Sequence, residues 1–442
     1  MTTWSERVAA MGLSEQAAAL ASRYFAEVAD RHDTLFGDGT PYRAWWVPGR
    51  IEVLGKHTDY GGGRSLLCAV ERGFHVVASP RHDGVIHVID ASTGSSIRIA
   101  FNRDAESKPG HWSDYPISVV RRVARDFPAA NTGMNLVIRS SLPSAAGLSS
   151  SSAMVIACFL PLAAINDLRR QDEWKAIADE DALAGYLGAM ENGRAFGPFA
   201  ADRGVGTQGG SEDQTAIMRS QPGQLLQYHF IPVTHEQTIA VPQGWQFVIG
   251  MSGVHAAKGG AVQARYNALA AEVAAMLALW NRRTGRRDES LFSALHSEAG
   301  APARLSAMIA ADPSLDPELA GRLDQFIDEC DRIIPGVSRL LAAGDVSAIG
   351  GLVARSQANA ESALRNQIPE TVHLARRATE LGAAAASAFG AGFGGSVWAL
   401  VREEQAAAFA GRWRDDYLAQ FPARRHRAEF FASHPGPAAR EL

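Results

Sequence analysis

The sequence has few cysteines, and their positions exclude two kinds of site. Cys68, Cys158 and Cys330 are the only cysteines among 442 residues, and they lie far apart within apolar runs. This spacing fits neither a structural zinc site nor a disulfide framework. Because unpaired cysteines are typical of a reducing compartment, we expect a cytoplasmic protein.

An excess of basic charge and a long apolar segment are also lacking. The formal net charge is −4, which gives no electrostatic basis for binding nucleic acid or an acidic membrane surface. An anionic nucleotide would need local groups, such as a helix N-terminus, a few basic side chains and a metal ion. The N-terminal residues show no secretory pattern, and the longest apolar run, 153–165, is too short to cross a bilayer. We therefore expect a soluble monomer or small homo-oligomer with neither nucleic-acid nor membrane partners.

What the chain does contain is enough ordinary globular sequence for two domains. Hydrophobic residues make up 46% and charged residues 20% of the chain, as in folded proteins. A length of 442 residues exceeds what one hydrophobic core usually serves. The pattern places a boundary near residues 220–245, although no linker marks it, and this predicts domains 1–230 and 231–442.

Helical and strand patterns are mixed along the chain. Residues 4–29 carry apolar positions at helical spacing, and residues 44–101 hold short β-rich runs typical of an antiparallel meander. Residues 193–211 are rich in glycine and short polar residues, and predict a long ordered loop. The other predicted elements are a helix 113–126, a strand 134–138, a long helix from about Ser150, a helix 173–192, a strand 246–250, helices 261–280, 317–341, 346–363 and 371–381, and a strand after residues 390–395.

Residues 142–153 (LPSAAGLSSSSA) place small residues between a predicted strand and a long apolar helix. Small residues allow backbone amides to approach an anion, and the first helical turn supplies N–H groups and a favourable dipole. Serine hydroxyls there can bind a phosphate oxygen or a divalent metal. The alternative interpretation is a serine-rich N-cap on a core helix.

Residues 48–63 (PGRIEVLGKHTDYGGG) bring four polar side chains into one strand and turn. Asp59 and His57 suit the hydroxyl groups of a sugar, and Arg50 could stabilise developing negative charge. The glycines suit a backbone that passes close to a ligand. The alternative interpretation is a polar hairpin with a flexible glycine tip.

Residues 204–214 (GVGTQGGSEDQ) place Asp213 at a glycine-rich turn before a predicted strand 215–218. This position suits a base at the edge of a cleft, although a lone Asp often only caps a turn. A further glycine motif, 390–395 (GAGFGG), follows a helix and precedes a strand. That order is the reverse of a dinucleotide fingerprint, so a Rossmann fold is excluded.

In this order, the four segments resemble the motifs of the GHMP kinases. Segment 49–63 narrows the resemblance to the galactokinases, whose pattern is similar to G-R-[IV]-x-[LV]-[IL]-G-E-H-T-D-Y-x-G-G. Segments 143–151, 212–214 and 390–395 resemble the phosphate loop, the Met-Asp-Gln segment and the third glycine motif. The resemblance, which covers about residues 44–400, implies a two-domain α+β GHMP kinase fold. Its N-terminal domain would be like the second domain of ribosomal protein S5, its C-terminal domain ferredoxin-like, and its active site in the interdomain cleft.

The resemblance also implies an ATP- and Mg²⁺-dependent enzyme that phosphorylates the anomeric (C1) hydroxyl of galactose or a close relative. Asp213 would accept the proton of the sugar hydroxyl, and Arg50 would keep Asp213 ionised and neutralise charge on the phosphoryl group. Ser151 and Glu191 would hold the metal ion. The implied sugar-binding residues are Lys56, His57, Asp59, Gly210, Glu212 and Tyr266, and the implied nucleotide-binding residues are Pro143, Ala145, Gly147, Leu148, Ser149, Ser150 and Ser151.

Two departures from the galactokinase pattern leave the substrate open. Lys56 stands where galactokinases have Glu, and Glu212 stands where they have Met. Lys56 could pair with the C6 carboxylate of a uronate, or it could pair with Glu212 and leave a neutral sugar as substrate. The alternatives are a uronic acid or arabinose 1-kinase and, in another class, a non-catalytic regulatory sensor of sugar and ATP. The presence of Arg50, Asp213 and the phosphate loop favours an enzyme.

Overall fold

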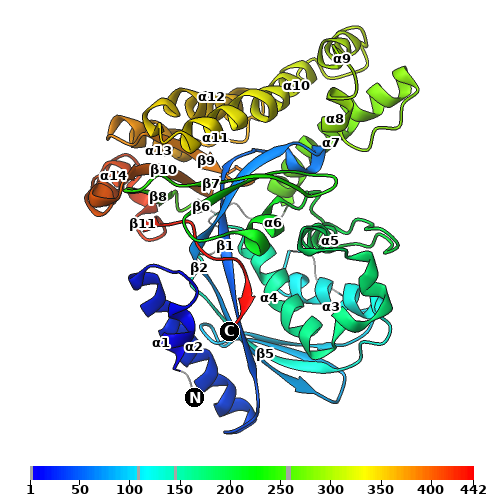
Figure 1. The fold of residues 1–442 in the computed structure, drawn as a ribbon, viewed down its shortest axis with the longest axis vertical. Helices are drawn as coiled ribbons and strands as arrows, with labels where there is room; N and C mark the ends of the chain where they lie inside the picture. The colour runs from blue at the N-terminus through cyan, green and yellow to red at the C-terminus, as the bar shows by residue number, and fades with distance from the viewer. Residues whose placement is uncertain (1–2, 107–109, 144–146, 255–259) are drawn as a thin grey trace.

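The computed structural model describes residues 3–106, 110–143, 147–254 and 260–442, and these form two sheets with helices packed against them (Figure 1). The first sheet has the order β12-β1-β2-β5-β3-β4, and β6 and β7 extend it from β2. Its strands are β1 (Arg43–Leu54), β2 (Arg64–Arg81), β3 (Val85–Asp90), β4 (Ser96–Ala100), β5 (Gly133–Ser140), β6 (Gln224–His229), β7 (Thr234–Ala240) and β12 (Arg440–Glu441).

The predicted meander over residues 44–101 is wrong in its connectivity. The pairs β1–β2 and β3–β4 are antiparallel as expected, but β5 lies between β2 and β3 and runs parallel to β3. A distant strand therefore separates two hairpins that are adjacent in the sequence.

Helices cover both faces of the first sheet because its central strands are apolar on both sides. Successive strand residues point to opposite faces. Trp46 and Val77 pack in one cluster with α2, whereas the neighbouring residues Val47 and Val76 pack in the main core with α4. The helices on the first of these faces are α1 (Trp4–Ala9) and α2 (Glu15–Phe36), and those on the other are α3 (Asp114–Asp126), α4 (Ser150–Ile165), α5 (Glu180–Asn192) and α6 (Glu212–Arg219).

Two sequence predictions in this domain need correction. The helix predicted over residues 4–29 is two helices, because Gly12 takes a left-handed backbone conformation (φ 82°) between them. Residues 215–218, predicted as a strand, lie within helix α6. Glu212 and Asp213 occupy the first turn of α6, where acidic side chains interact favourably with the helix dipole.

The second sheet is antiparallel, with the order β11-β8-β10-β9. In chain order its elements read β-α-β-β-α-β, the arrangement expected for a ferredoxin-like domain. Its strands are β8 (Trp245–Met251), β9 (Ala385–Phe389), β10 (Ser396–Arg402) and β11 (Phe430–Ser433), and α13 (Pro369–Glu380) and α14 (Ala406–Gln420) pack on it.

A helical layer is inserted between β8 and β9 and forms the upper part of the molecule in Figure 1. Its helices are α7 (Gly260–Thr284), α8 (Leu291–Leu295), α9 (Ala301–Ala310), α10 (Leu319–Asp328), the π-helical turn η4 (Glu329–Ile333), α11 (Ile334–Ala342) and α12 (Gly350–Ser362). Within the described segments, no helix combines the length and apolarity needed to cross a bilayer.

The last residues of the chain return to the first sheet, so the sheets do not follow a division at residue 230. Strand β7 belongs to the first sheet, and β12 pairs with β1. The backbone N–H groups of Ala438 and Ala439 donate to carbonyls of Ser220 and Ile217, at the end of α6, at 3.1 and 2.8 Å. The tail thereby anchors the helix that carries Asp213.

Deleting residues 435–442 is expected to lower the free energy of unfolding by about 2–5 kcal/mol, because several backbone hydrogen bonds to the first sheet and to α6 are lost. Chemical denaturation followed by tryptophan fluorescence measures this. Deleting residues 441–442 alone should cost less, since the bonds to α6 remain. Equal stability of the full chain and the 435–442 deletion would contradict the anchoring role.

Candidate active site

A cavity of about 540 Å³ lies where the two domains meet. It is lined by residues of β1, α4 and α6 from the first domain, by Tyr266 of α7, and by Gly390 and Ala391 between β9 and β10. The predicted site residues that line it are Arg50, His57, Asp59, Gly147, Ser149, Ser150, Ser151, Glu191, Gly210, Glu212, Asp213 and Tyr266. Four segments far apart in the sequence therefore converge on one cavity.

Arg50 and Asp213 form a hydrogen-bonded ion pair in the wall of this cavity. The Nε of Arg50 donates to Asp213 Oδ1 at 2.8 Å, and Nη2 lies 2.7 Å from the same oxygen. Ser152 Oγ donates to Asp213 Oδ2 at 3.1 Å. Burial alone would lower the pKa of Arg50, but Asp213, Glu212 and Glu52 outweigh it and raise that pKa. The guanidinium is thus permanently charged and holds one carboxylate at the cavity wall.

The predicted phosphate loop also depends on Arg50. Its Nη1 donates to the carbonyl of Gly147 at 2.6 Å, and its backbone N–H donates to the carbonyl of Leu148 at 3.2 Å. Gly147 and Ser149 have left-handed backbones (φ 76° and 56°) immediately before α4 begins. This bend turns the N-terminus of α4 towards the cavity, where Ser150 and Ser151 line the wall. N–H groups and dipole at such a terminus suit an anion.

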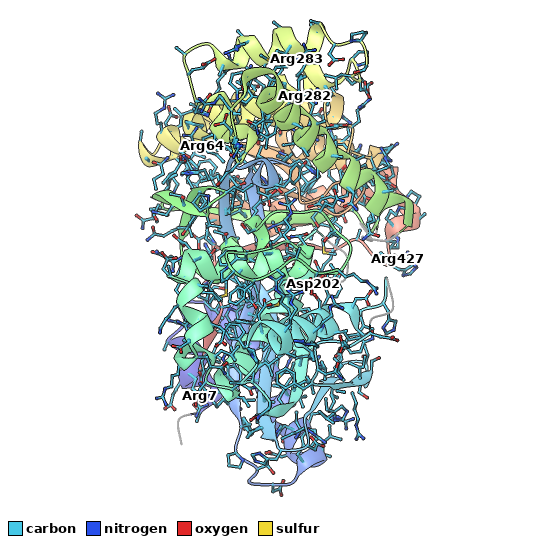
Figure 2. All side chains as sticks on the ribbon, turned by 90° about the vertical axis from the view of Figure 1, so that its right-hand side faces the viewer. Arg7, Arg64, Asp202, Arg282, Arg283 and Arg427 are labelled. Atoms are coloured by element: carbon cyan, nitrogen blue, oxygen red, sulfur yellow. The ribbon has the colours of Figure 1, made fainter. Side chains whose placement is uncertain are left out.

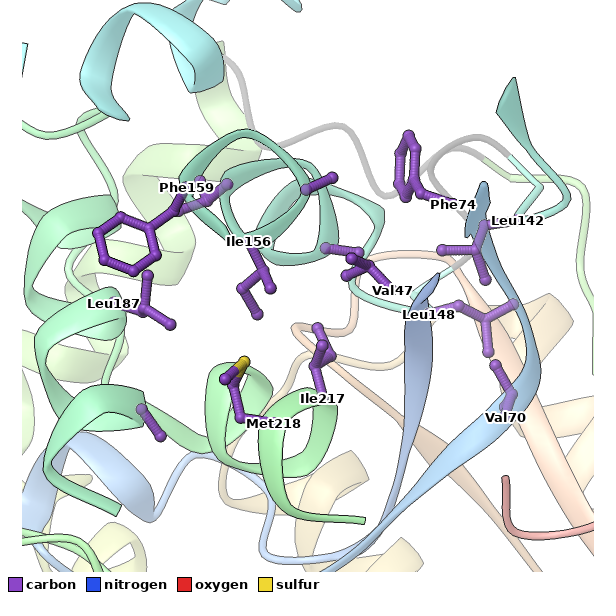
Figure 3. Close-up of a cluster of buried hydrophobic side chains, with 14 of the residues drawn as sticks. Val47, Val70, Phe74, Leu142, Leu148, Ile156, Phe159, Leu187, Ile217 and Met218 are labelled. Carbon is purple, nitrogen blue, oxygen red and sulfur yellow. The ribbon is translucent and has the colours of Figure 1, made fainter. Parts of the chain in front are cut away.

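Three predicted nucleotide-binding residues differ from the others in their placement. Leu148 is buried in the core, where Figure 3 shows its side chain near Leu142 and Val70. Pro143 is not among the lining residues, and Ala145 lies outside the described residues. The Leu148 side chain therefore packs the loop onto the sheet, and only the backbone of this residue is left to contact a ligand.

Residues 55–63 bring His57 and Asp59 to the opposite wall. His57 takes a left-handed backbone (φ 58°), and its ring contacts the Tyr60 hydroxyl at 3.0 Å and the carbonyl of Ala391 at 3.1 Å. The backbone N–H of Glu212 donates to Asp59 Oδ2 at 3.2 Å. A Cβ at position 210 would collide with the Asp59 carboxylate, so Gly210 is required there. Burial raises the pKa of Asp59.

The second domain holds this turn through contacts that the sequence did not reveal. Arg322 of α10 donates to the carbonyl of His57 at 2.6 Å and to the Tyr60 hydroxyl at 3.2 Å. Gln325 donates to the carbonyl of Lys56 at 3.3 Å, and Glu329 accepts the backbone N–H of Gly55 at 2.9 Å. The turn is thus tied to α10 and η4, although no motif marks these residues.

The structure places Lys56 where neither sequence interpretation expected it. Its side chain does not line the cavity, and its ammonium donates to Ser356 Oγ of α12 at 2.9 Å. Among the ion pairs of the described residues, none joins Lys56 to Glu212. Glu212 instead accepts a hydrogen bond from Ser65 Oγ at 2.8 Å and lies beside Arg50.

Glu191 and the loop 193–211 close one side of the cavity. Glu191 is buried, lines the cavity with Ser151, and accepts a hydrogen bond from Gln214 at 2.6 Å. The loop is ordered as predicted, and Asn192 Oδ1 accepts from Thr207 Oγ1 and from the Gly209 N–H at 2.9 and 2.8 Å. Asp202, labelled in Figure 2, lies 3.3 Å from Arg121 of α3. These contacts fasten both halves of the loop.

The far end of the cavity holds residues that the sequence reasoning missed. Aromatic and apolar side chains line it beside the start of α3 and along α4, and they are Phe74, His111, Trp112, Tyr115, Ile138, Leu142 and Met154. The cluster of His111, Trp112 and Tyr115 at the start of the predicted helix 113–126 was an available signal. Glu52 was also missed, because it alternates with apolar residues along a strand.

Three family models match the chain. The galactokinase galactose-binding signature matches residues 30–80, the N-terminal domain of the GHMP kinases matches residues 114–194, and their C-terminal domain matches residues 337–419. The signature therefore contains Arg50 and the turn 55–63, and the N-terminal domain contains the phosphate loop and Glu191.

Curated relatives and solved structures agree with these matches. The galactokinase of Chloroflexus aurantiacus is 25% identical over 85% of this chain and 88% of its own, and that of Actinobacillus pleuropneumoniae is 27% identical over 81% and 85%. The structure of Lactococcus lactis galactokinase with galactose covers 94% of this chain and 99% of its own, with 21% identity and a TM-score of 0.75. Methanococcus jannaschii mevalonate kinase matches with a TM-score of 0.54 and 14% identity, covering 90% and 99%. These likenesses confirm the predicted two-domain α+β fold.

Replacing Arg322 by Met is expected to destabilise the protein by about 2–4 kcal/mol, because the carbonyl of His57 and the Tyr60 hydroxyl lose a buried charged donor. Chemical denaturation measures the change. Arg376→Met, which removes a solvent-exposed contact with Glu380, should leave the midpoint unchanged. Similar midpoints for the Arg322 variant and wild type would show that α10 does not hold the turn.

Proposed function

The chain belongs to the GHMP kinases as a galactokinase-like sugar kinase, and from this we propose that it transfers the γ-phosphoryl group of ATP to the C1 hydroxyl of galactose or a close relative. The observation that carries the proposal is the contact of buried Arg50 with half-buried Asp213 beside the N-terminus of α4. It sets a base and an anion-binding helix end in one cavity.

In the proposed reaction, the C1 oxygen attacks the γ-phosphorus, and the bond to the β–γ bridging oxygen breaks. The hydroxyl proton passes to Asp213, whose carboxylate is held by Arg50 and Ser152. Arg50 also lies close enough to the phosphate loop to offset negative charge during transfer. Phosphoryl transfer needs positioning and charge neutralisation more than covalent catalysis, and this arrangement supplies both.

The two ends of the cavity suit the two substrates. Backbone N–H groups and hydroxyls at residues 147–151 would bind the phosphates of ATP. The aromatic residues near the start of α3 would stack against its adenine ring. His57, Asp59, Gly210 and Tyr266 line the other end, where they would bind sugar hydroxyls.

Charge at the sugar end favours a neutral sugar over a uronate. Glu52, Asp59, Glu212 and Asp213 all line the cavity near Arg50, whereas the ammonium of Lys56 is directed to Ser356. A C6 carboxylate would meet further carboxyl groups and no lysine, and like charges in a buried site repel strongly.

Mg²⁺ would be held by Ser151 and Glu191, which line the cavity between the phosphate loop and α5. Both supply the hard oxygen donors that Mg²⁺ prefers. Among the described residues, no three His, Cys, Asp or Glu side chains gather into a metal site, which suits an ion that keeps waters and phosphate oxygens as its other ligands. Bound Mg²⁺ would neutralise charge on the β- and γ-phosphates.

ADP release from Mg-ATP across galactose, glucose, arabinose, galactosamine, galacturonate and glucuronate tests the function and the substrate together. We expect turnover of galactose or a close neutral relative and none of the uronates. Asp213→Asn keeps the shape of the side chain but removes the base, so kcat should fall by about 100- to 10,000-fold.

Binding of ATP and sugar without turnover in the wild type would overturn the enzyme proposal. Turnover of galacturonate or glucuronate would overturn the charge argument, and full activity of Asp213→Asn would overturn the role of the base.

The metal role predicts that chelation of Mg²⁺ abolishes turnover and that Ser151→Ala raises the Mg²⁺ concentration for half-maximal rate by about tenfold, because one oxygen ligand is lost. A Mg²⁺ titration at saturating sugar measures it. Ser347→Ala, in an exposed turn beside Asp345, is the matched control and should follow the wild-type curve. An unchanged titration for Ser151→Ala would remove Ser151 from the metal site.

A further inference from the structure

Two buried carboxyl groups lie beside the Arg50 guanidinium and take no part in the proposed phosphoryl transfer. Glu52 of β1 and Glu212 of α6 are 4% and 5% exposed, and both line the cavity. Glu52 Oε2 lies 4.0 Å from Nη2 of Arg50, and Glu212 Oε1 lies 3.9 Å from its Nε. Arg50 therefore has two further carboxyl groups beside it in addition to Asp213.

The hydrogen bonding of these two groups is incomplete unless a proton lies between them. The Oε1 atoms of Glu52 and Glu212 are both buried and receive no hydrogen bond from any described donor. The two carboxyl groups lie close enough to interact with each other. Since an ionised carboxylate can only accept, a hydrogen bond between them would need a proton on one of the two groups.

The charges around the pair favour one proton. The facing groups are Arg50 and Lys56 from the β1 segment, Asp59 from the turn, Asp213 from α6 and Tyr266 from α7. Burial raises the pKa of Glu52 to about 7, and burial together with the charge of Glu52 raises the pKa of Glu212 well above its usual range. Two adjacent carboxylates rarely ionise together in a buried site.

We propose that Glu52 and Glu212 share one proton and, as a singly charged pair, position the Arg50 guanidinium for the reaction. Neutral Glu212 donates to the Glu52 carboxylate, and that carboxylate lies 4.0 Å from Nη2 of Arg50. Both are positioning residues, because they act through Arg50. The role in catalysis rests on the proposed kinase function, whereas the shared proton does not.

The position of Lys56 supports this assignment. Its charge lowers the pKa of Glu52, so Lys56 favours the ionised form of that partner. The lysine that departs from the galactokinase pattern thereby compensates Glu52 at longer range and leaves Glu212 to keep the proton. The Lys56 ammonium, the Glu52 carboxylate and the neutral Glu212 then form one group without net charge.

Infrared difference spectra between the wild type and each variant at neutral pH test the shared proton without any assay of turnover. The wild type should show the C=O stretch of a buried protonated carboxyl group, and Glu212→Gln and Glu52→Gln should each lose it, because the amide takes over as donor and the remaining carboxylate ionises. Glu236→Gln is the matched control. The pKa of Glu236, beside Arg64, is lowered, so its removal should leave the band in place.

Steady-state kinetics with the sugar that the wild type accepts tests the positioning role. Each single Gln variant keeps one donor and one charge, so kcat should fall by less than about tenfold. The Glu52→Gln/Glu212→Gln double variant removes the charge that faces Arg50, and its kcat should fall by about 100-fold or more, beyond the product of the single effects. Groups that only fill space would leave kcat nearly unchanged in the double variant as well, because Gln has nearly the shape of Glu.

A band that is absent from the wild type, or that persists in both single variants, would overturn the shared proton. Multiplicative losses in the double variant would overturn the joint positioning of Arg50. If the wild type turned over no sugar, the infrared result would still decide the first part, so failure of the kinase proposal is distinguishable from failure of this one.

Discussion

Arg50 lies in a central strand and Asp213 lies in the first turn of a helix 163 residues later, and the site is built around their contact. The same guanidinium also binds the carbonyl of Gly147, so one buried cation joins the proposed base, the strand and the predicted phosphate loop. Its burial costs desolvation energy, which the surrounding carboxyl groups offset. Loss of Arg50 would therefore separate three elements at once, in addition to removing one charge from the cavity.

Residues of the second domain hold the turn that carries His57 and Asp59. Arg322, Gln325 and Glu329 bind backbone groups of residues 55–57, and the carbonyl of Ala391 accepts a hydrogen bond from the His57 ring at 3.1 Å. These contacts cross the domain boundary, so the turn that presents His57 and Asp59 has its shape only when both domains are packed together. The tail that returns to α6 couples the domains a second time, on the side of Asp213.

The sequence was informative where chemistry requires particular residues at short spacing. Arg50, Asp59, Asp213 and the serines at the start of α4 were predicted because their motifs are local, and the structure brings them to one cavity. Residues 215–218 were misread as a strand because four residues are too few to separate the helical period from the strand period. Lys56 was placed in the site by its neighbours in the sequence, but the direction of a side chain depends on tertiary contacts such as Ser356, 300 residues away. Arg322 and Glu329 carry no motif, so only the folded chain reveals them.

Charge balance in the cavity explains why an acidic protein can hold an anionic nucleotide. The formal net charge of −4 offers no general attraction, so under the proposed function binding would rely on the helix terminus, Arg50 and a metal ion. Every carboxyl group that ionises near Arg50 weakens that local attraction. A proton kept between Glu52 and Glu212 removes one negative charge from the cavity wall without removing the side chain that packs there. The buried acid pair would thus be linked to the nucleotide through the Arg50 guanidinium, and the protonation of the pair would set how much of the guanidinium's charge remains for the phosphates.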